Sequence, residues 1–165
     1  MMCNKIVLNR IDEQHFKDHI QIASQKTWKK VLSAVVLDKI VHLTECHTYY
    51  VNVLCADLMM LSHPPSVRET EEAWNAQLSK HKGKVISELE KLNSNRLKVL
   101  TNVALLEKVN EPNGKSFLDK VRLPLSSTQK AVSYLLDYDY IYQDQAGALM
   151  VVDPLMKLFL CQRYQ

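Results

Sequence analysis

The stretch SSTQKAVSYLLDYDYIYQDQAGALMVVDPLMKLFL, residues 126–160, predicts a helix, a β-hairpin and a second helix in succession. Its polar start, residues 126–128, predicts a helix N-cap, and the apolar residues that follow recur at helical spacing. The aromatic run 140–142 and the apolar run 149–152 predict two strands joined by a polar turn. Asp153 and Pro154 then predict the N-cap and the first residue of the last helix.

Two further helices are predicted ahead of this stretch. A helix over residues 96–108 follows the polar cap at residues 93–95, and a short helix over residues 116–121 follows a Pro-Asn-Gly turn. Three helices followed by a two-stranded wing is the order of a winged helix-turn-helix domain. We therefore predict a mainly α fold, with an N-terminal helical bundle followed by a C-terminal winged helix that carries a two-stranded wing.

The N-terminal part predicts a short strand at residues 5–8 and three helices. The first helix follows Asp12, the second covers residues 29–43, and the third covers residues 49–61. The third helix is apolar on most sides, which predicts a buried position. The segment SHPPS at residues 62–66 is the predicted boundary, because two prolines cannot lie inside a helix. We expect a helical bundle over 1–62, a long amphipathic connecting helix over 67–92, and the winged helix over 93–165.

Composition and charge are those of an ordinary helical protein. The chain of 165 residues has 47% hydrophobic and 24% charged residues and only 3 glycines, which favours helices. Its net charge of +3 is mildly basic, which neither demands nor excludes a nucleic-acid partner.

The sequence predicts neither a membrane span nor a secretory leader. The start turns polar within the first residues, and Asn52 and Asp57 interrupt the longest apolar stretch. The four cysteines, Cys3, Cys46, Cys55 and Cys161, have no pair spacing. We therefore expect free thiols, a cytoplasmic location and no membrane partner.

Catalytic motifs are absent from the sequence. Glycines occur only at positions 83, 114 and 147, so the chain contains neither a Walker-type phosphate loop nor a Gly-x-Ser-x-Gly elbow. We expect no catalytic residue and no enzyme activity.

A metal-dependent module is a third and weaker hypothesis. It rests on His15 and His19, which are four residues apart, and on the downstream cluster of His42, Cys46 and His47. Further ligands at recognisable spacing are missing, so no metal is expected.

Nucleic-acid binding is an open alternative for the winged helix. The third helix of such a domain enters the major groove and the wing touches phosphate. The candidate contacts are the polar and basic residues at the start of that helix and just before it, namely Lys120, Arg122, Ser126, Ser127, Thr128, Gln129 and Lys130. The wing segment Gln143-Asp144-Gln145 carries an acid and no cation, which makes it a poor phosphate clamp. The competing reading is a winged helix that packs against protein, with half-buried tyrosines at 134, 138, 140 and 142.

The stretches LTECHTYYVNVLC at residues 43–55 and VVDPLMKLFL at residues 151–160 together resemble the C-terminal part of archaeal-type and bacterial AAA+ ATPases of the signal-transducing, STAND-like group. In the first stretch, LTECHTYYVNVLC, the residues compare with a family pattern of threonine, any residue, glycine, histidine, proline and two tyrosines. In the family, an apolar helix with Leu-Cys follows this pattern. The second is VVDPLMKLFL at residues 151–160, the end of the family's winged helix. His47 matches the pattern, whereas Cys46 replaces its glycine and Thr48 its proline.

The resemblance implies a helical lid and a winged helix without the nucleotide-binding core. Residues 6–8 would then be the last strand of that core, and His47, Thr48 and Tyr49 would face the nucleotide if the core is present. ATP and magnesium enter through the family resemblance only, and this chain by itself is expected to hold no cofactor.

The expected function is therefore non-catalytic. The chain would couple a nucleotide state to domain movement, or bind a partner, which is an AAA+ core domain or another protein. The alternative is a free-standing winged-helix regulator that binds DNA.

Overall fold

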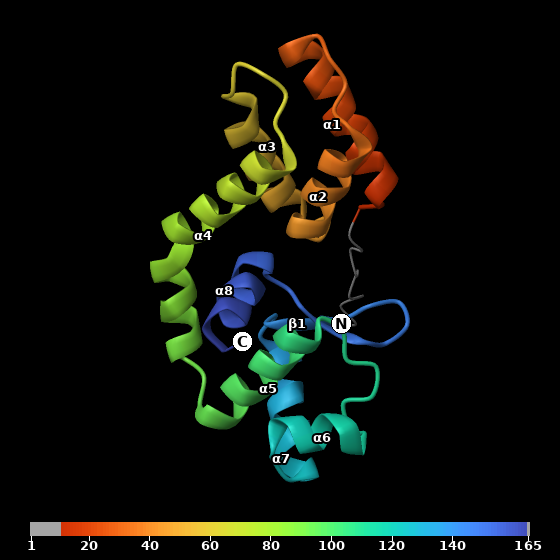
Figure 1. The fold of residues 1–165 in the computed structure, drawn as a ribbon. Coiled ribbons are helices and arrows are strands. Elements are labelled where there is room, and N and C mark those ends of the chain that lie inside the picture. The colour runs from red at the N-terminus through yellow and green to blue at the C-terminus, as the bar shows by residue number, and fades with distance from the viewer. Residues whose placement is uncertain (1–10, 165) are drawn as a thin grey trace, which may run out of the picture. The chain divides into compact units, whose positions relative to one another are not determined.

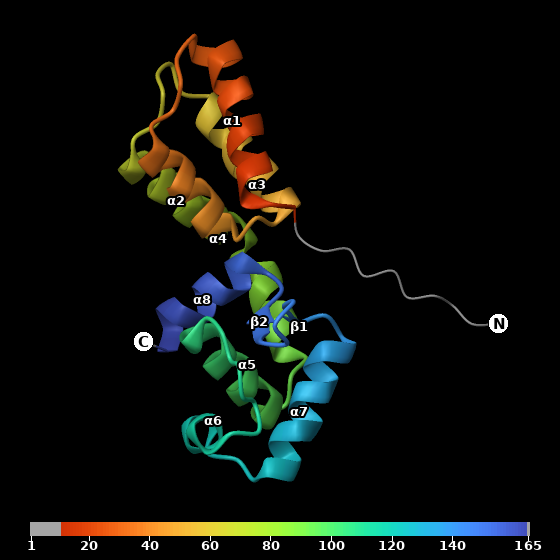
Figure 2. The same ribbon diagram turned by 90° about the vertical axis from the view of Figure 1, so that its right-hand side faces the viewer.

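The computed structural model describes residues 11–164, so the predicted strand at residues 5–8 lies outside the described residues. The described part is mainly helical, with eight helices and one two-stranded antiparallel sheet, as predicted. The chain divides into two compact units, one running to Gln77 and the other starting at Leu78. This division falls inside the long helix α4, Val67–Glu90, which continues from one unit into the other (Figure 1 and Figure 2).

Three helices form the first unit together with the first part of α4. They are α1 (Glu13–Trp28), α2 (Ala34–Thr44) and α3 (Thr48–Met59), and each packs against the other two. Ile40 and Leu54 are fully buried between them. Truncating such a leucine to alanine typically costs about 2–5 kcal/mol. Contrary to the prediction, α3 buries only one face, because Asn52 and Ala56 on its other face are exposed.

The link between α1 and α2 explains why the predicted helix over 29–43 begins five residues late. Lys29 ends α1 in the left-handed conformation with φ 56°. The Gln21 side chain then holds the following loop in a non-helical path, accepting from the Leu32 amide and donating to the Leu32 carbonyl at 2.8 Å each. Buried Ser24 adds a hydrogen bond to the Lys30 carbonyl at 3.0 Å. Because these hydrogen bonds occupy the loop's backbone groups, the apolar periodicity alone did not locate the helix start.

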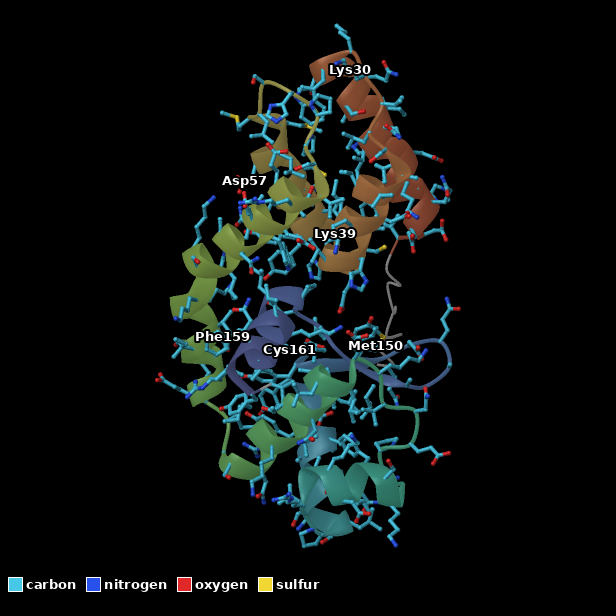
Figure 3. The ribbon with its side chains drawn as sticks, in the orientation of Figure 1. Lys30, Lys39, Asp57, Met150, Phe159 and Cys161 are labelled. Carbon is cyan, nitrogen blue, oxygen red and sulfur yellow. The ribbon has the colours of Figure 1, made fainter. Side chains whose placement is uncertain are left out.

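A capping box starts α4. The Ser66 hydroxyl accepts from the Glu69 amide at 3.2 Å, and the Glu69 carboxylate accepts from the Ser66 amide at 2.8 Å. Hydrogen bonds donated to the carboxylate by the Ser66 amide and hydroxyl, together with the nearby His63 ring, lower the pKa of Glu69 to about 2. Further along, Trp74 is buried in the first unit, and Gln77 donates a hydrogen bond to Asp57 of α3, which Figure 3 labels.

The second unit surrounds helix α5, Ser94–Leu106. This helix packs against α7 (Leu125–Asp137), α8 (Pro154–Tyr164) and the short α6 (Lys115–Val121). Its inward face is fully buried and consists of Val99, Leu100, Val103 and Ala104. Cys161 of α8, labelled in Figure 3, lies close enough to α5 for its thiol to donate to the Ala104 carbonyl at 3.6 Å.

The wing is the antiparallel pair of β1 (Ile141–Gln143) and β2 (Leu149–Val151), in the register Ile141 to Val151. The sequence reading missed a further pairing on the other edge of β2. Val109, between α5 and α6, exchanges backbone hydrogen bonds with Leu149 at 2.9 and 3.0 Å. The order of three helices and a hairpin is thus confirmed, and the connection from α5 to α6 is tied to the sheet.

The two predicted helix starts around the wing have different outcomes. Asp153 caps α8 as predicted, its carboxylate accepting from the amides of Leu155 and Met156. The predicted N-cap at residues 126–128 is wrong, because α7 already begins at Leu125 with Pro124 as the N-cap residue. Proline has a fixed φ near −65° that suits a helix entrance, so the serines lie within the first turn.

Candidate functional site

The exposed side of α7 brings together part of the predicted nucleic-acid set. Ser126, Gln129 and Lys130 are exposed, and Ser127 is half-buried. Thr128 does not lie on this surface, because its side chain is fully buried and its hydroxyl donates to the Pro124 carbonyl at 3.2 Å. Apart from exposed Leu125, the accessible part of the first two turns is therefore polar, and it carries one positive charge.

Lys120 and Arg122 lie on a different surface of the same unit. Lys120 is in the last turn of α6, and Arg122 follows it as the left-handed C-cap with φ 53°. Both line an open groove of about 430 Å³ with α5 side chains and with the carboxylate of Asp119. The predicted set thus divides into an α7 group and a group that faces α5 beside an acid.

The Asp144 carboxylate closes the turn between the two strands of the wing. One oxygen of Asp144 accepts from the amides of Ala146 and Ala148 at 2.9 Å each, and Gly147 completes the turn with φ 82°. The other oxygen pairs with the Lys108 ammonium at 2.5 Å. The hydrogen bond from Lys108 and those from the turn amides lower the pKa of Asp144. Because Lys108 neutralises this acid and residues 143–148 contain no cation, the wing offers no positive charge to a phosphate.

An aromatic stack covers the last turns of α7. The prediction of half-buried tyrosines is confirmed for Tyr134 and wrong for exposed Tyr138, and the sequence did not predict that Arg96 joins them. The Arg96 guanidinium carbon lies 3.3 Å from the centre of the Tyr134 ring, and Tyr134 stacks on Tyr138 at 4.2 Å. Tyr138 is 63% exposed. The spacing of four residues between the tyrosines was a signal for a shared helix face, whereas nothing in the sequence pointed to Arg96. Arginine and tyrosine are both enriched at protein interfaces.

A rigid corner between α2 and α3 holds the other predicted residues. Glu45 and Cys46 both adopt the left-handed conformation, with φ 47° and 54°. Their amides and that of His47 donate to carbonyls in the last turn of α2, which fixes the direction in which α3 leaves. His47 is the N-cap residue of α3, and Thr48 and Tyr49 behind it are exposed.

The corner also anchors a chain of aromatic rings. The His47 ring lies 5.0 Å from the Tyr50 ring, which in turn meets Trp74 of α4 edge-on at 5.6 Å. Tyr49 contacts Tyr50 at 5.1 Å and is 53% exposed. His47 is therefore held by packing, while Thr48 and Tyr49 form the accessible part of the corner.

Residues 11–164 contain no group of three histidine, cysteine or acidic side chains arranged to hold a metal ion. Among the same residues, no helix combines the length and the hydropathy needed to cross a bilayer.

The comparison with protein families agrees with the geometry of the second unit. Residues 86–162 match the family model described as a probable winged helix domain. No curated protein and no solved structure matches the chain. The matched segment runs from the last turns of α4 through α5, α6, α7 and the wing to α8. The second unit therefore has the winged-helix fold.

Proposed function

We propose that this chain is the non-catalytic lid and winged-helix portion of an AAA+ ATPase-like protein. The observation that carries the proposal is the corner between α2 and α3. The ATPase pattern has glycine before its histidine, and Cys46 at that position has φ 54°, a conformation that glycine adopts at no cost. A backbone conformation that suits glycine at this position supports the proposal, although the residue here is cysteine.

The proposed role of the corner is to face a nucleotide held by a core domain. His47 starts α3, and the amides of the first helical turn have no intrahelical acceptors. Thr48 and Tyr49 extend from that turn into solvent and are available to a ligand. The core would supply ATP, magnesium and the catalytic groups, and this chain would supply only contacts.

The proposed role of the winged helix is to contact protein. Its wing is neutral, and the exposed end of α7 carries the Arg96, Tyr134 and Tyr138 stack. Such rings bury much area at a low entropic cost because each has only two rotatable angles. A change of nucleotide state would move this domain as a rigid body, with α4 and the segment at residues 62–66 as the connection.

A nucleotide titration tests this proposal. Amide spectra of the isotope-labelled chain are recorded while Mg·ATP is added to millimolar concentration. The expected changes are confined to residues 47–50, are weak because the core domain is absent, and disappear in Tyr49→Ala, whose side chain is exposed. His42→Ala, at an exposed position on α2, is the matched control and should leave them unchanged. Changes centred elsewhere, or hydrolysis of ATP by the chain alone, would contradict the proposal.

The second candidate function is a DNA-binding regulator. The observation that favours it is the polar start of α7, where Ser126, Gln129 and Lys130 are exposed. A DNA complex made through these residues would weaken steeply as salt is added, because phosphate contacts release counterions. Binding of a mixed-sequence duplex at two salt concentrations separates the two functions.

A further inference from the structure

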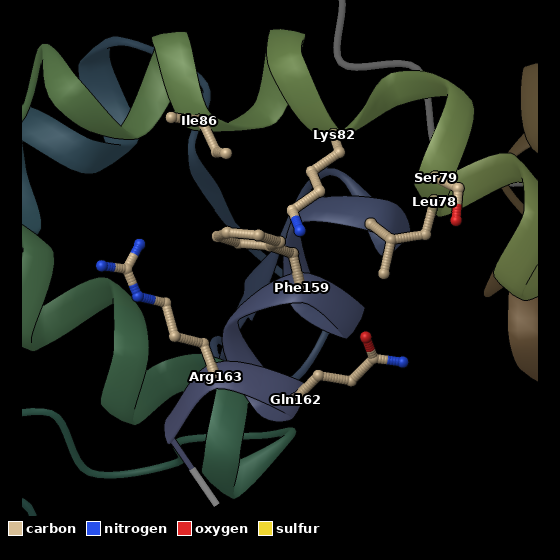
Figure 4. Close-up of a pocket in the computed structure, with 7 residues that line it drawn as sticks. All are labelled: Leu78, Ser79, Lys82, Ile86, Phe159, Gln162 and Arg163. Carbon is tan, nitrogen blue, oxygen red and sulfur yellow. The ribbon is translucent and has the colours of Figure 1, made fainter.

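A groove on the second unit lies between the last part of α4 and α8 (Figure 4). Its volume is about 420 Å³. Helix α4 contributes one stripe of its surface and α8 the other, and the lining residues are Leu78, Ser79, Lys82, Ile86, Phe159, Gln162 and Arg163. The α4 residues repeat at four-residue steps over about 12 Å, which is roughly two helical turns.

The floor of the groove is apolar and its edges are cationic. Leu78 and Phe159 are almost fully buried, and Ile86 is half-buried beside them. Lys82 and Arg163 are exposed, one on each helix. Figure 4 shows Lys82 pointing from α4 toward Phe159, with Arg163 farther along α8.

The two helix segments that form the groove carry positive charge only. Residues 78–87 contain three lysines and no acid, and residues 154–164 contain Lys157 and Arg163 and no acid. These segments therefore contribute +5 to a chain whose net charge is +3, and two of the five cations, Lys82 and Arg163, line the groove itself. The nearest acids farther along α4 are Glu88, which pairs with Lys91 at 2.7 Å, and Glu90.

From this combination we infer that the groove binds an acidic amphipathic helix of a partner protein. Two neighbouring helices present a groove into which the ridge of a third helix packs. Leucine or phenylalanine side chains of the partner would cover half-buried Ile86 and the small exposed edges of Leu78 and Phe159, and its carboxylates would meet Lys82 and Arg163. A second copy of this chain is a poor occupant, because two such grooves repel each other. A nucleic-acid backbone would leave the apolar floor uncovered.

This inference deepens the proposed function, since it names a surface and the chemistry of a protein partner. It rests on the winged helix being a protein-contact domain. The buried area is small, so the expected affinity is weak, in the micromolar range.

The test uses a synthetic helical peptide of about 14 residues, which makes roughly four turns. Leucines occupy positions i, i+3, i+4 and i+7, glutamates fill the other positions, and a fluorophore reports binding to the full chain. A second peptide has the same composition in scrambled order, so that it has the charge without the apolar stripe. The expected result is micromolar binding of the first peptide, with amide shifts confined to residues 78–86 and 159–163.

Paired charge reversals locate the site. Lys82→Glu with Arg163→Glu should weaken binding about tenfold or more, because like charges then face the peptide. Lys98→Glu with Lys115→Glu, at exposed positions on α5 and α6, should change it less than about twofold. All four positions are exposed, and circular dichroism verifies that both variants keep the native helix content.

Three results would overturn the inference: no binding, equal binding of the scrambled peptide, or displacement of the peptide by duplex DNA. Failure of the peptide alone leaves the proposed function standing, because the Mg·ATP titration at the α2–α3 corner is measured separately. If that titration fails while the peptide still binds, the proposed ATPase function is wrong and the inference about the groove still stands.

Discussion

Replacing Cys46 by glycine should give a more stable first unit than replacing it by alanine. Cys46 has φ 54°, and a residue with a Cβ atom loses about 1–2 kcal/mol in this left-handed conformation. Glycine avoids that cost but loses about 0.5–1 kcal/mol more backbone entropy on folding than alanine does. Taken at the centres of these ranges, the net difference in the free energy of unfolding is about 0.75 kcal/mol in favour of glycine.

The comparison is made between two variants so that the lost thiol cancels. The only two tryptophans of the chain, Trp28 and Trp74, both lie in the first unit, so their fluorescence reports the unfolding of that unit. With an m-value of about 1 kcal/mol/M, the urea midpoint of Cys46→Gly should lie about 0.5–1 M above that of Cys46→Ala. The order should reverse for Asn52→Gly and Asn52→Ala on the exposed face of α3, where glycine weakens the helix.

Equal midpoints for the two Cys46 variants, or a higher midpoint for alanine, would refute this reasoning. They would mean that the corner between α2 and α3 relaxes to another conformation without cost. The glycine-like backbone would then no longer support the likeness to the ATPase lid pattern.

Three other outcomes follow from the structure. Ser66→Ala removes the α4 cap and should lower the free energy of unfolding by about 1 kcal/mol in the same fluorescence assay. The control Ser62→Ala, at an exposed position before the helix, should change that free energy by less than about 0.5 kcal/mol. Because the Ser66 hydrogen bonds lower the pKa of Glu69 to about 2, the ionised carboxylate stabilises the fold above its ordinary pKa of about 4.5, and this stabilisation is lost as pH falls toward 2. The stability difference between the native chain and Glu69→Gln should therefore be present at pH 5 and shrink as the pH falls below it; a difference that persists undiminished at pH 2 would contradict this. Burial raises the pKa of the Cys55 thiol to about 12. Iodoacetamide at pH 8 should therefore label Cys55 about 10³-fold more slowly in the native chain than in urea, as measured by mass spectrometry. Similar labelling rates would show that the thiol is not buried in the native chain.

Much of the fold was predictable because its helices are amphipathic and its caps are local. The apolar steps in residues 67–92 predicted α4 closely, and Asp153 with Pro154 predicted the start of α8. Helix starts that depend on contacts with residues farther away in the chain were not predictable. The beginning of α2 depends on Gln21, which holds Leu32 from the preceding helix, and no periodicity contains that information.

The candidate site was predictable only in part, for the same reason. The predicted polar residues at the start of α7 lie on one exposed face except for Thr128, whose hydroxyl turns back to its own helix. The neutral wing depends on Lys108, and the aromatic stack depends on Arg96, both of which lie more than thirty residues from their partners. A single sequence does not show such pairs, because their side chains meet only after the second unit has folded.

Duplex binding measures the central claim, that the winged helix contacts protein and does not clamp phosphate. The anisotropy of a labelled mixed-sequence duplex is followed while the full chain is added at 50 mM and at 200 mM salt. The account predicts no saturable binding up to about 100 µM at either salt concentration, because the wing offers no cation and the start of α7 offers one. Micromolar binding at 50 mM salt that weakens about 10²-fold at 200 mM, and that is lost in Lys130→Gln, would contradict the account.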